Sequence, residues 1–373
     1  MIYDVIIIGG GLSGLISAIE LSRAGLSVLL IEKKDYPQHK VCGEYVSNEV
    51  FEYLKSLGFD PFIFGAKNIN RFELSAVSGI KLSTELPLGG FGISRFALDE
   101  ALYHIAISQS VNFQLNDSAE HIEKVGNSDL FRIFTQKDKV FNAKLIIGAQ
   151  GKRSVIDKNL KRSFFEKRSP FIAVKCHYKG DFPEDLVALH NFKGGYCGLS
   201  MVETGHINVC YLSSESNLKK YKDIRKMELE LLSQNPHLQT VFHNWEPVFK
   251  APLSISQIYF HEKNLTDQHV LMVGDAAGLI YPLCGNGMAM AIHGAKLLSE
   301  QVLRYFKTEI DRITLEKNYT KIWKSHFSNR IKAGGFLQNF FGTPFVSGTA
   351  VRSLKIFPFM AKSVIKFTHG KKI

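Results

Sequence analysis

Three glycines near the start of the chain, Gly9, Gly11 and Gly14, have the spacing G-x-G-x-x-G. In such a loop the first glycine allows a tight turn, the second lets the backbone approach a pyrophosphate, and the third lets a helix pack closely on a strand. The predicted helix that follows would aim its free N–H groups and positive dipole end at the phosphates. The pattern therefore predicts a dinucleotide site, to which we also assign Leu12 and Ser13.

A carboxylate stands where such a site needs a partner for the ribose. Glu32 ends a second aliphatic run about twenty residues after the glycines, where it can accept hydrogen bonds from adenosine ribose hydroxyls. We include Lys33, the next residue, in the predicted site. Because Glu32 would repel a 2′-phosphate, the site favours FAD or NAD over NADP.

The elements around these residues predict a βαβ unit. The aliphatic run Val5 to Ile8 is typical of a strand that is buried on both faces. Leu15 to Ala24 carries helix-favouring residues, Gly25 ends that helix, and Ser27 to Ile31 predicts the second strand. Strand, glycine loop, helix and acid thus occur in the order of a Rossmann-like α/β fold.

Later patterns predict a second kind of unit. Alternation on either side of Ser78-Gly79 predicts a hairpin from Phe72 to Leu86. Alternating segments with glycines between them predict an antiparallel sheet from Phe171 to Leu212. The chain is predicted to be helical from Gly287 to Phe306 and mostly helical beyond that.

Composition limits the classes of protein. A length of 373 residues favours about two domains. The net charge of +11 favours anionic partners. Since the basic residues are scattered and no nucleic-acid motif occurs, we do not predict nucleic acid as a partner.

The cysteines and the apolar runs bear on metals and location. Five cysteines, an odd number, show no Cys/His ligand spacing, so neither a disulfide framework nor a metal site is predicted. The start, MIYDVIII, lacks the basic region of a signal peptide. The charge-free stretch Ala333 to Val351 is broken by Pro344 and four glycines, which argues against a membrane span. We therefore expect a cytoplasmic protein.

A second glycine stretch, VLMVGDAAGLIYPLCGNGMAMAI, lies in the last third of the chain. Together with the first, it resembles flavoproteins of the para-hydroxybenzoate hydroxylase superfamily, most closely their geranylgeranyl reductase-like branch. The resemblance implies that the first loop binds the ADP half of FAD and that Gly274 and Asp275 bind its ribityl and pyrophosphate half. Gly285, Gly287 and Met288 match the family's Gly-x-Gly and helix start, beside the flavin. Electrostatics agree, because a helix starting near Gly287 would aim its positive dipole end at the edge that carries the charge of the reduced flavin.

The resemblance also implies a division of the chain. A discontinuous, Rossmann-like FAD-binding domain would comprise residues 1–165 and 262–306, and an antiparallel-sheet substrate domain would comprise residues 166–261. The hairpin near residues 71–87 is a candidate to join the second domain. Residues 307–373 would form a helical C-terminal segment.

Two further segments correspond to family motifs, one in full and one with a departure. ISRFALDEAL resembles its Arg-x-x-Leu-Asp helix, which implies a contact between Arg95 and the cofactor, although Arg95 can instead pair with Asp99, four residues on. GAQGKRS stands where the family has Gly-Ala-Asp-Gly, with Gln150 in place of the acid. The electron donor therefore stays open between transient NAD(P)H and a protein donor.

The segment KVCGEYVS resembles the Lys-x-Cys-Gly signature of the reductase-like branch, which lies near the flavin ring. Cys42 and Glu44 are therefore the candidates for positioning a substrate or moving a proton. Alternatively, Cys42 is a small buried apolar residue and Glu44 pairs with a surface lysine.

The resemblance leaves the reaction open. The leading hypothesis is an FAD-dependent oxidoreductase that reduces carbon–carbon double bonds of a lipophilic compound. The alternatives are a monooxygenase that hydroxylates or epoxidises an aromatic, polyketide or isoprenoid compound, and, more remotely, a flavin-binding or electron-transfer partner without turnover. Halogenases are not predicted, because their W-x-W-x-I-P signature is missing. The C-terminal tail places Lys355, Lys362, Lys366, Lys371 and Lys372 among aromatic residues, which predicts either a helical lid or a peripheral membrane contact.

Overall fold

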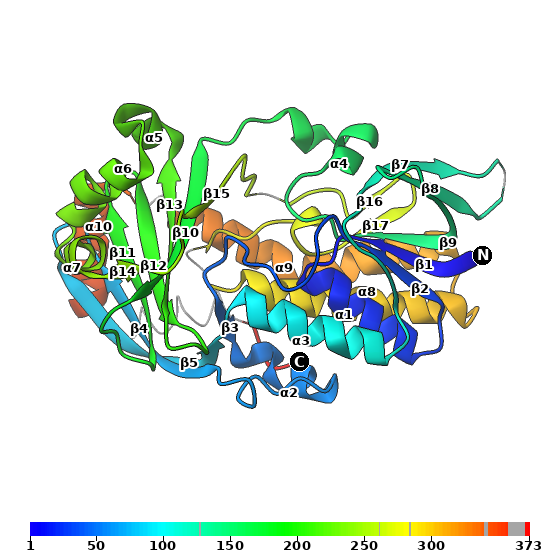
Figure 1. The fold of residues 1–373 in the computed structure, drawn as a ribbon, viewed down its shortest axis with the longest axis horizontal. Helices are drawn as coiled ribbons and strands as arrows, with labels where there is room; N and C mark the ends of the chain where they lie inside the picture. Colours follow the sequence, from blue (N-terminus) through cyan, green and yellow to red (C-terminus); the bar gives the residue numbers. More distant parts are fainter. Residues whose placement is uncertain (127, 261, 283–284, 339–341, 357–369) are drawn as a thin grey trace.

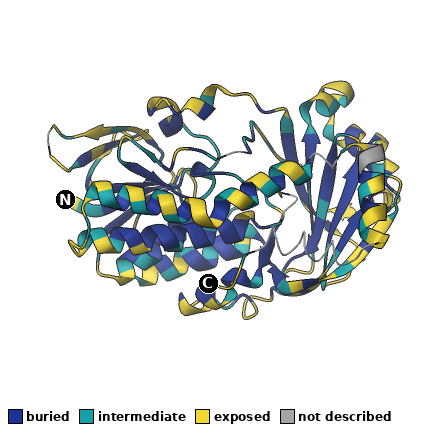
Figure 2. Ribbon diagram, turned by 180° about the vertical axis from the view of Figure 1, so that it is seen from behind, coloured by how far each residue is buried: buried dark blue, intermediate teal, exposed yellow. Residues whose placement is uncertain are grey.

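The computed structural model describes the whole chain except residues 127, 261, 283–284, 339–341 and 357–369. Two β-sheets lie toward opposite ends of the molecule, and long helices pack along one face of the sheet nearer the amino terminus (Figure 1). Buried residues follow the sheets and the helix faces that meet them, whereas the outer helix faces are exposed (Figure 2). Much of the lysine- and aromatic-rich tail lies outside the described residues.

The first sheet forms around the aliphatic run at the amino terminus. Strand β1 (Ile2–Ile8) pairs in parallel with β2 (Val28–Ile31) on one side and β9 (Val140–Gly148) on the other. The order is β16-β17-β9-β1-β2-β6, with β8 also paired to β9 and β7 paired to β8. The other strands are β6 (Asn112–Gln114), β7 (Ala119–Lys124), β8 (Phe131–Thr135), β16 (Thr266–Asp267) and β17 (Val270–Met272). The central strands are apolar because both of their faces are covered.

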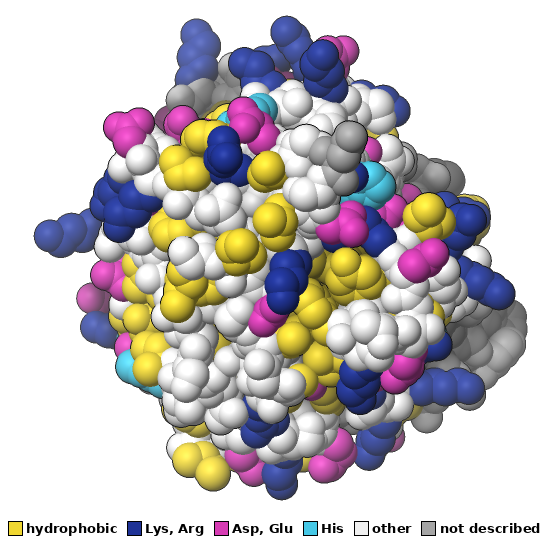
Figure 3. Space-filling view, turned by 90° about the vertical axis from the view of Figure 1, so that its right-hand side faces the viewer, with side chains coloured by type: hydrophobic (Ala, Val, Ile, Leu, Met, Phe, Trp, Pro, Cys, Tyr) yellow, Lys and Arg dark blue, Asp and Glu magenta, His cyan; other side chains and the backbone are white. Residues whose placement is uncertain are grey.

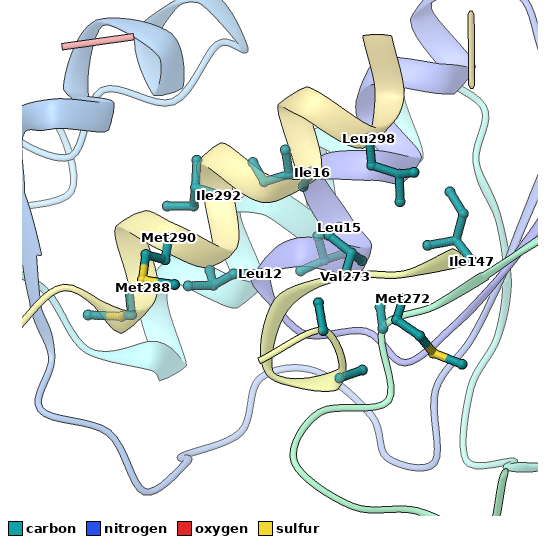
Figure 4. Close-up of a cluster of buried hydrophobic side chains, with 14 of the residues drawn as sticks. Leu12, Leu15, Ile16, Ile147, Met272, Val273, Met288, Met290, Ile292 and Leu298 are labelled. Atoms are coloured by element: carbon teal, nitrogen blue, oxygen red, sulfur yellow. The ribbon is translucent and has the colours of Figure 1, made fainter. Parts of the chain in front are cut away.

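The two glycine stretches share one core beside this sheet. Helix α1 (Leu12–Arg23) begins directly after Gly11, three residues earlier than the sequence predicts. It packs against α3 (Arg95–Ser108) and α8 (Gly287–Phe306), and α8 packs against α9 (Arg312–Gln338). Figure 4 shows side chains of α1, α8, β9 and β17 meeting in one cluster. This packing brings segments from the two ends of the sequence side by side.

The second sheet is mostly antiparallel, as its alternation predicts. Strands β10 (Phe171–Lys179), β13 (Ile207–Ser214), β12 (Gly195–Met201) and β11 (Leu186–Phe192) follow one another as antiparallel neighbours. The predicted hairpin is formed by β4 (Lys67–Ser75) and β5 (Lys81–Gly92), and β4 pairs in parallel with β11. The sheet also contains β3 (Tyr45–Ser47), β14 (Glu246–Pro247) and β15 (Leu253–Ser256). Since β3 pairs with β5, the amino-terminal segment that joins this sheet is longer than the predicted residues 71–87.

The two faces of the second sheet differ. Alternation along β10 sends Ile172, Val174, Cys176 and Tyr178 to one face, where they pack beneath α6 (Ile224–Glu230) and α7 (Pro236–Asn244). The opposite face carries Ala173, Lys175 and His177 and turns toward the first sheet. The remaining helices are α2 (Phe51–Ser56), α4 (Val155–Asn159), α5 (Glu215–Tyr221) and α10 (Pro344–Ile356), with short 3-10 turns η1 (Asn48–Val50), η2 (Ser163–Glu166), η3 (Leu232–Gln234) and η4 (Gly274–Ala276).

Within the described ranges, no helix has both the length and the apolar character needed to cross a bilayer. At the end of the molecule nearest the amino terminus, basic, acidic and apolar side chains are interspersed (Figure 3). The face drawn there therefore has mixed charge.

Candidate active site

Each of the three glycines of the first loop occupies its position for a different structural reason. Gly9 has φ +106°, and a side chain there would collide with the carbonyl of Ala149. A side chain at Gly14 would collide with the carbonyl of Gly9, so this glycine permits the close approach of α1 and β1. At Gly11 the nearest atom to an added Cβ is Nη2 of Arg95, at 3.9 Å. Packing within the chain therefore does not require Gly11, and the space that it leaves open fits the pyrophosphate of a dinucleotide.

Glu32 lies beside this loop and is hydrogen-bonded to it. One carboxylate oxygen accepts a hydrogen bond from the Gly10 N–H at 2.6 Å, and the other accepts one from the Lys34 N–H at 3.1 Å. Each carboxylate oxygen has a second lone pair, so the side chain can still accept from ribose hydroxyls. Lys33 is exposed at the same end of the cavity.

Arg95 makes the pairing with Asp99 that its sequence spacing allows, and it also lines the cavity. Its guanidinium makes two hydrogen bonds of 2.7 Å to Asp99, which also binds Lys40 at 2.8 Å. Burial alone would raise the pKa of Asp99, but the positive charges of Arg95 and Lys40 lower it. The ionised Asp99 holds the guanidinium above Gly11, where it can contact a phosphate.

Asp275 lies directly across from this loop. Gly274 has φ +64°, and a side chain there would collide with the Ser13 hydroxyl, so the Gly-Asp turn sits against the start of α1. Burial raises the pKa of Asp275, against the opposing charges of Lys263, Arg95 and Lys152. Across the part of the chain that the structure describes, no hydrogen bond reaches the Asp275 carboxylate, which leaves its oxygens available for ligand hydroxyls.

A lysine that sequence reasoning missed holds this region together. The Lys263 ammonium donates to the carbonyl of Lys152 at 2.9 Å and to the carbonyl of Asp275 at 2.8 Å. Burial lowers the pKa of Lys263 to about 8, with Asp275 acting in the opposite direction. A single lysine in the segment HEKN gives no sequence signal for this role.

Gln150, the departure from the family motif, lies beside an acid of the chain. Its side-chain nitrogen donates to Asp157 at 3.1 Å, and Asp157 in turn binds Arg162 at 2.8 Å. An aspartate at position 150 would face the carboxylate of Asp157 and repel it. The uncharged amide of Gln150 avoids that repulsion and donates a hydrogen bond to Asp157 instead.

One cavity of about 1120 Å³ joins these groups to the second sheet. All of the predicted site residues except Gly14 and Gly274 line it, including Gly285, Gly287 and Met288 at the start of α8. Its far wall is apolar and is formed by Phe72, Leu74, Leu82, Leu86, Leu189 and Leu212, with α10 beside them. Pockets for one drug-sized ligand span about 300–1,000 Å³. This cavity has room for a dinucleotide and for an apolar second ligand.

Cys42 faces the cavity between the two ends. Burial raises the pKa of its thiol, and the positive charge of Arg95 acts in the opposite direction. A thiol with a raised pKa stays protonated at neutral pH. Cys42 is thus half-buried and lines the cavity.

Glu44 is buried, and the lysine that it pairs with, Lys175, is buried too rather than at the surface. The Glu44 side chain is fully buried at φ +53°. One carboxylate oxygen accepts from the Arg95 backbone N–H at 2.7 Å and from the buried Lys175 ammonium, and the other contacts His177 Nε2 at 2.6 Å. Burial alone would raise the pKa of Glu44, but His177 and Lys175 lower it overall.

His39, Glu44 and His177 have the types and proximity of metal ligands, with their ligand atoms within 4.8 Å of one another. Lys175 argues against a cation here, because its ammonium occupies the same carboxylate and like charges repel. We interpret the group as a hydrogen-bonded ion network.

The sequence pattern around Lys175 and His177 could have shown that both lie on one face of a strand. In FIAVKCHYKG they alternate with Val174, Cys176 and Tyr178, which places them on one face of the strand. Polar residues on one face usually indicate exposure to solvent. Here the segment of residues 40–44 covers that face, and nothing in β10 itself predicts it.

Known proteins share this architecture. Residues 2–317 match the family described as FAD binding domain. Conditioned medium factor receptor 1 of Dictyostelium discoideum is 25% identical over 356 residues, which cover 88% of this chain and 68% of that protein. Digeranylgeranylglycerophospholipid reductase of Methanosarcina acetivorans is 25% identical over 358 residues, which cover 91% of this chain and 85% of that protein. The solved structure of a flavin-dependent brominase superposes with a TM-score of 0.80 at 18% identity, over 99% of this chain and 93% of that one, a likeness of fold alone.

The matched family and the geometry agree on the cofactor. Both glycine stretches border one cavity, with an open space above Gly11 and carboxylates of Glu32 and Asp275 on its wall. The predictions of FAD and of the superfamily are therefore confirmed. The chain belongs to the FAD-binding domain family and is an FAD-dependent oxidoreductase of the para-hydroxybenzoate hydroxylase superfamily.

Proposed function

We propose that this chain reduces carbon–carbon double bonds of a lipophilic substrate. The observation that carries the proposal is one continuous cavity, which runs from the first glycine loop past Cys42 to an apolar sheet face. A hydrocarbon chain on that face gains about 25 cal/mol for each Å² of apolar surface that it buries. The similarity to a digeranylgeranylglycerophospholipid reductase supports an isoprenoid chain as the substrate class.

The roles of the residues follow from their positions. Bound FAD supplies hydride transfer. Arg95 and the loop around Gly11 bind the pyrophosphate, Asp275 binds the ribityl chain, and the apolar wall aligns the substrate and excludes water. Cys42, protonated because burial raises its pKa, holds a proton at Sγ for the carbon that does not receive the hydride.

The donor and the setting extend the same proposal. The chain has one G-x-G-x-x-G loop, which is used for FAD, so NAD(P)H or a protein donor would bind transiently. We further propose a cytoplasmic enzyme that meets its lipophilic substrate at a membrane surface.

Anaerobic stopped-flow spectroscopy tests the reaction. FAD-loaded protein is reduced with dithionite and mixed with an unsaturated geranylgeranyl compound, with its fully saturated counterpart, or with air-saturated buffer. We expect the absorbance of oxidised flavin to return with the unsaturated compound alone, together with a product that has gained two hydrogen atoms per double bond.

Two results would contradict the proposal. A product that contains oxygen and forms only in air would identify a monooxygenase. Reoxidation that is equally slow with all compounds would identify a flavin-binding protein without turnover.

A further inference from the structure

The segment of residues 40–44 is held by side chains of the second sheet. Lys175 Nζ donates to the carbonyl of Lys40 at 3.1 Å, Asn208 Nδ2 to the carbonyl of Cys42 at 3.2 Å, and Ser200 Oγ to the carbonyl of Gly43 at 3.1 Å. Lys175, Ser200 and Asn208 are each fully buried. Carbonyls of irregular backbone that lie against the protein need hydrogen-bond donors, and three different strands supply them here.

The sheet register explains how these donors converge. His177 lies opposite Asn208, and Asn208 lies opposite Ser200, so the three form one row across β10, β13 and β12. Lys175 is two residues from His177 and therefore shares its face.

The same rows become apolar farther along the sheet. Ser200 lies opposite Val187, which is paired with Phe72 on the parallel strand β4. One sheet face thus has a polar part under residues 40–44 and an apolar part that lines the cavity.

We propose that Lys175, Ser200 and Asn208 are positioning residues that fix the Cys42 thiol relative to bound FAD. Lys175 also links the second sheet to the first glycine loop. It binds Glu44, which accepts a hydrogen bond from the backbone of Arg95, and the Arg95 guanidinium lies above Gly11. The inference rests on the proposed function for the identity of the reaction, whereas the rigidity of the Cys42 segment can be measured without it.

Thiol modification measures that rigidity. FAD-loaded Asn208→Ala and Ser200→Ala proteins are treated with iodoacetamide, and modification at each cysteine is followed by mass spectrometry. Loss of a hydrogen bond worth about 1 kcal/mol is expected to accelerate modification of Cys42 about fivefold. Cys176 and Cys197, buried elsewhere in the sheet, should react as slowly as in the unchanged protein.

Ser213→Ala provides the matched control. Ser213 is a fully buried serine of β13 whose hydroxyl accepts a hydrogen bond from Asn217 and contacts Ser214 and Met227, on the side of the strand away from Cys42. This variant should leave the modification rate of Cys42 unchanged. Equal acceleration at Cys42, Cys176 and Cys197 would show general loosening and overturn the inference, as would an unchanged rate at Cys42 in both test variants.

A second measurement separates this inference from the proposed function. If the unsaturated compound reoxidises the flavin, Asn208→Ala should slow that step while the dissociation constant of FAD stays within about twofold. If no compound reoxidises it, the proposed function fails, and the modification rates still decide whether these residues fix Cys42.

Discussion

The missing side chain of Gly11 keeps one end of the cavity open, since the atom nearest to an added Cβ is Nη2 of Arg95 at 3.9 Å. Gly11→Val would place a side chain in that space, and its Cβ would meet Arg95 Nη2 at an ordinary contact distance of 3.9 Å. We expect a folded protein whose FAD affinity falls at least tenfold, or about 1.4 kcal/mol. Isothermal titration of the apoprotein with FAD checks this.

Gly348→Val is the control for that substitution. It adds the same side chain to α10 at a position where an added Cβ meets no atom within 4 Å, and Gly348 does not line the cavity. Full FAD affinity in Gly11→Val would contradict the assignment of the first loop.

Burial disfavours the charged form of the Asp275 carboxylate, and none of its oxygens accepts a hydrogen bond from a described residue. Asp275→Ala should therefore weaken FAD binding about tenfold, the loss of a hydrogen bond to a charged group, without lowering the melting temperature of the apoprotein. Parallel FAD titration and thermal unfolding measure both quantities. A large fall in apoprotein stability together with unchanged FAD affinity would assign Asp275 a structural role.

Single residues were predictable where the pattern is local. Gly9, Gly11 and Glu32 follow from spacing within one βαβ unit. The partners of Glu44 did not follow, because Lys175 and His177 are more than 130 positions away in the sequence and meet it only through the register of β10.

At the level of elements, Glu44 joins β10 to the start of α3. Glu44→Gln leaves the buried Lys175 without its counter-charge, which should lower the free energy of unfolding by about 3–5 kcal/mol. Since the pKa of Glu44 is lowered from its ordinary value of 4.5, the stability from its charge is present above pH 4.5 and is lost as the pH falls through the folded pKa. The difference between the two proteins should therefore shrink below pH 4.5.

Urea unfolding over a series of pH values measures that difference. Glu246→Gln is the control, because Glu246 of β14 pairs with Lys179 of β10 in an exposed salt bridge and should change stability by less than about 1 kcal/mol. A difference for Glu44→Gln that stays constant with pH would rule out an ionised Glu44.

The elements themselves were largely predictable from periodicity. The aliphatic runs gave β1 and β2, and alternation gave the antiparallel strands and the hairpin. The pairing of β4 with β11 joins segments more than 100 residues apart, so no local pattern specifies it.

For the molecule as a whole, buried histidines should make stability sensitive to acid. Burial lowers the pKa of His39 to about 4 and those of His190 and His293 to about 3, from an ordinary value of 6.5. Their contribution is fully present above pH 6.5 and is lost as the pH falls toward the folded values. For the fully buried His190, the loss approaches about 1.4 kcal/mol per pH unit.

Thermal unfolding between pH 7 and pH 5 tests this sensitivity. We expect the melting temperature to fall across this range, and to fall less steeply in His190→Gln. His121→Gln, at an exposed position, is the control. An equal slope in the His190 variant would show that another group causes the sensitivity to acid.

The chain passes back and forth between its two sheets, so the two sheets are completed at different times during synthesis. Strand β17 pairs with β9 only when Leu271 reaches Ile147, and α8 begins at Gly287. A nascent chain that has emerged only as far as residue 256 contains every strand of the second sheet but lacks Asp275. The apolar wall of the cavity can therefore form on the ribosome before the FAD site is complete, which exposes that wall to chaperones until the last third of the protein has been made.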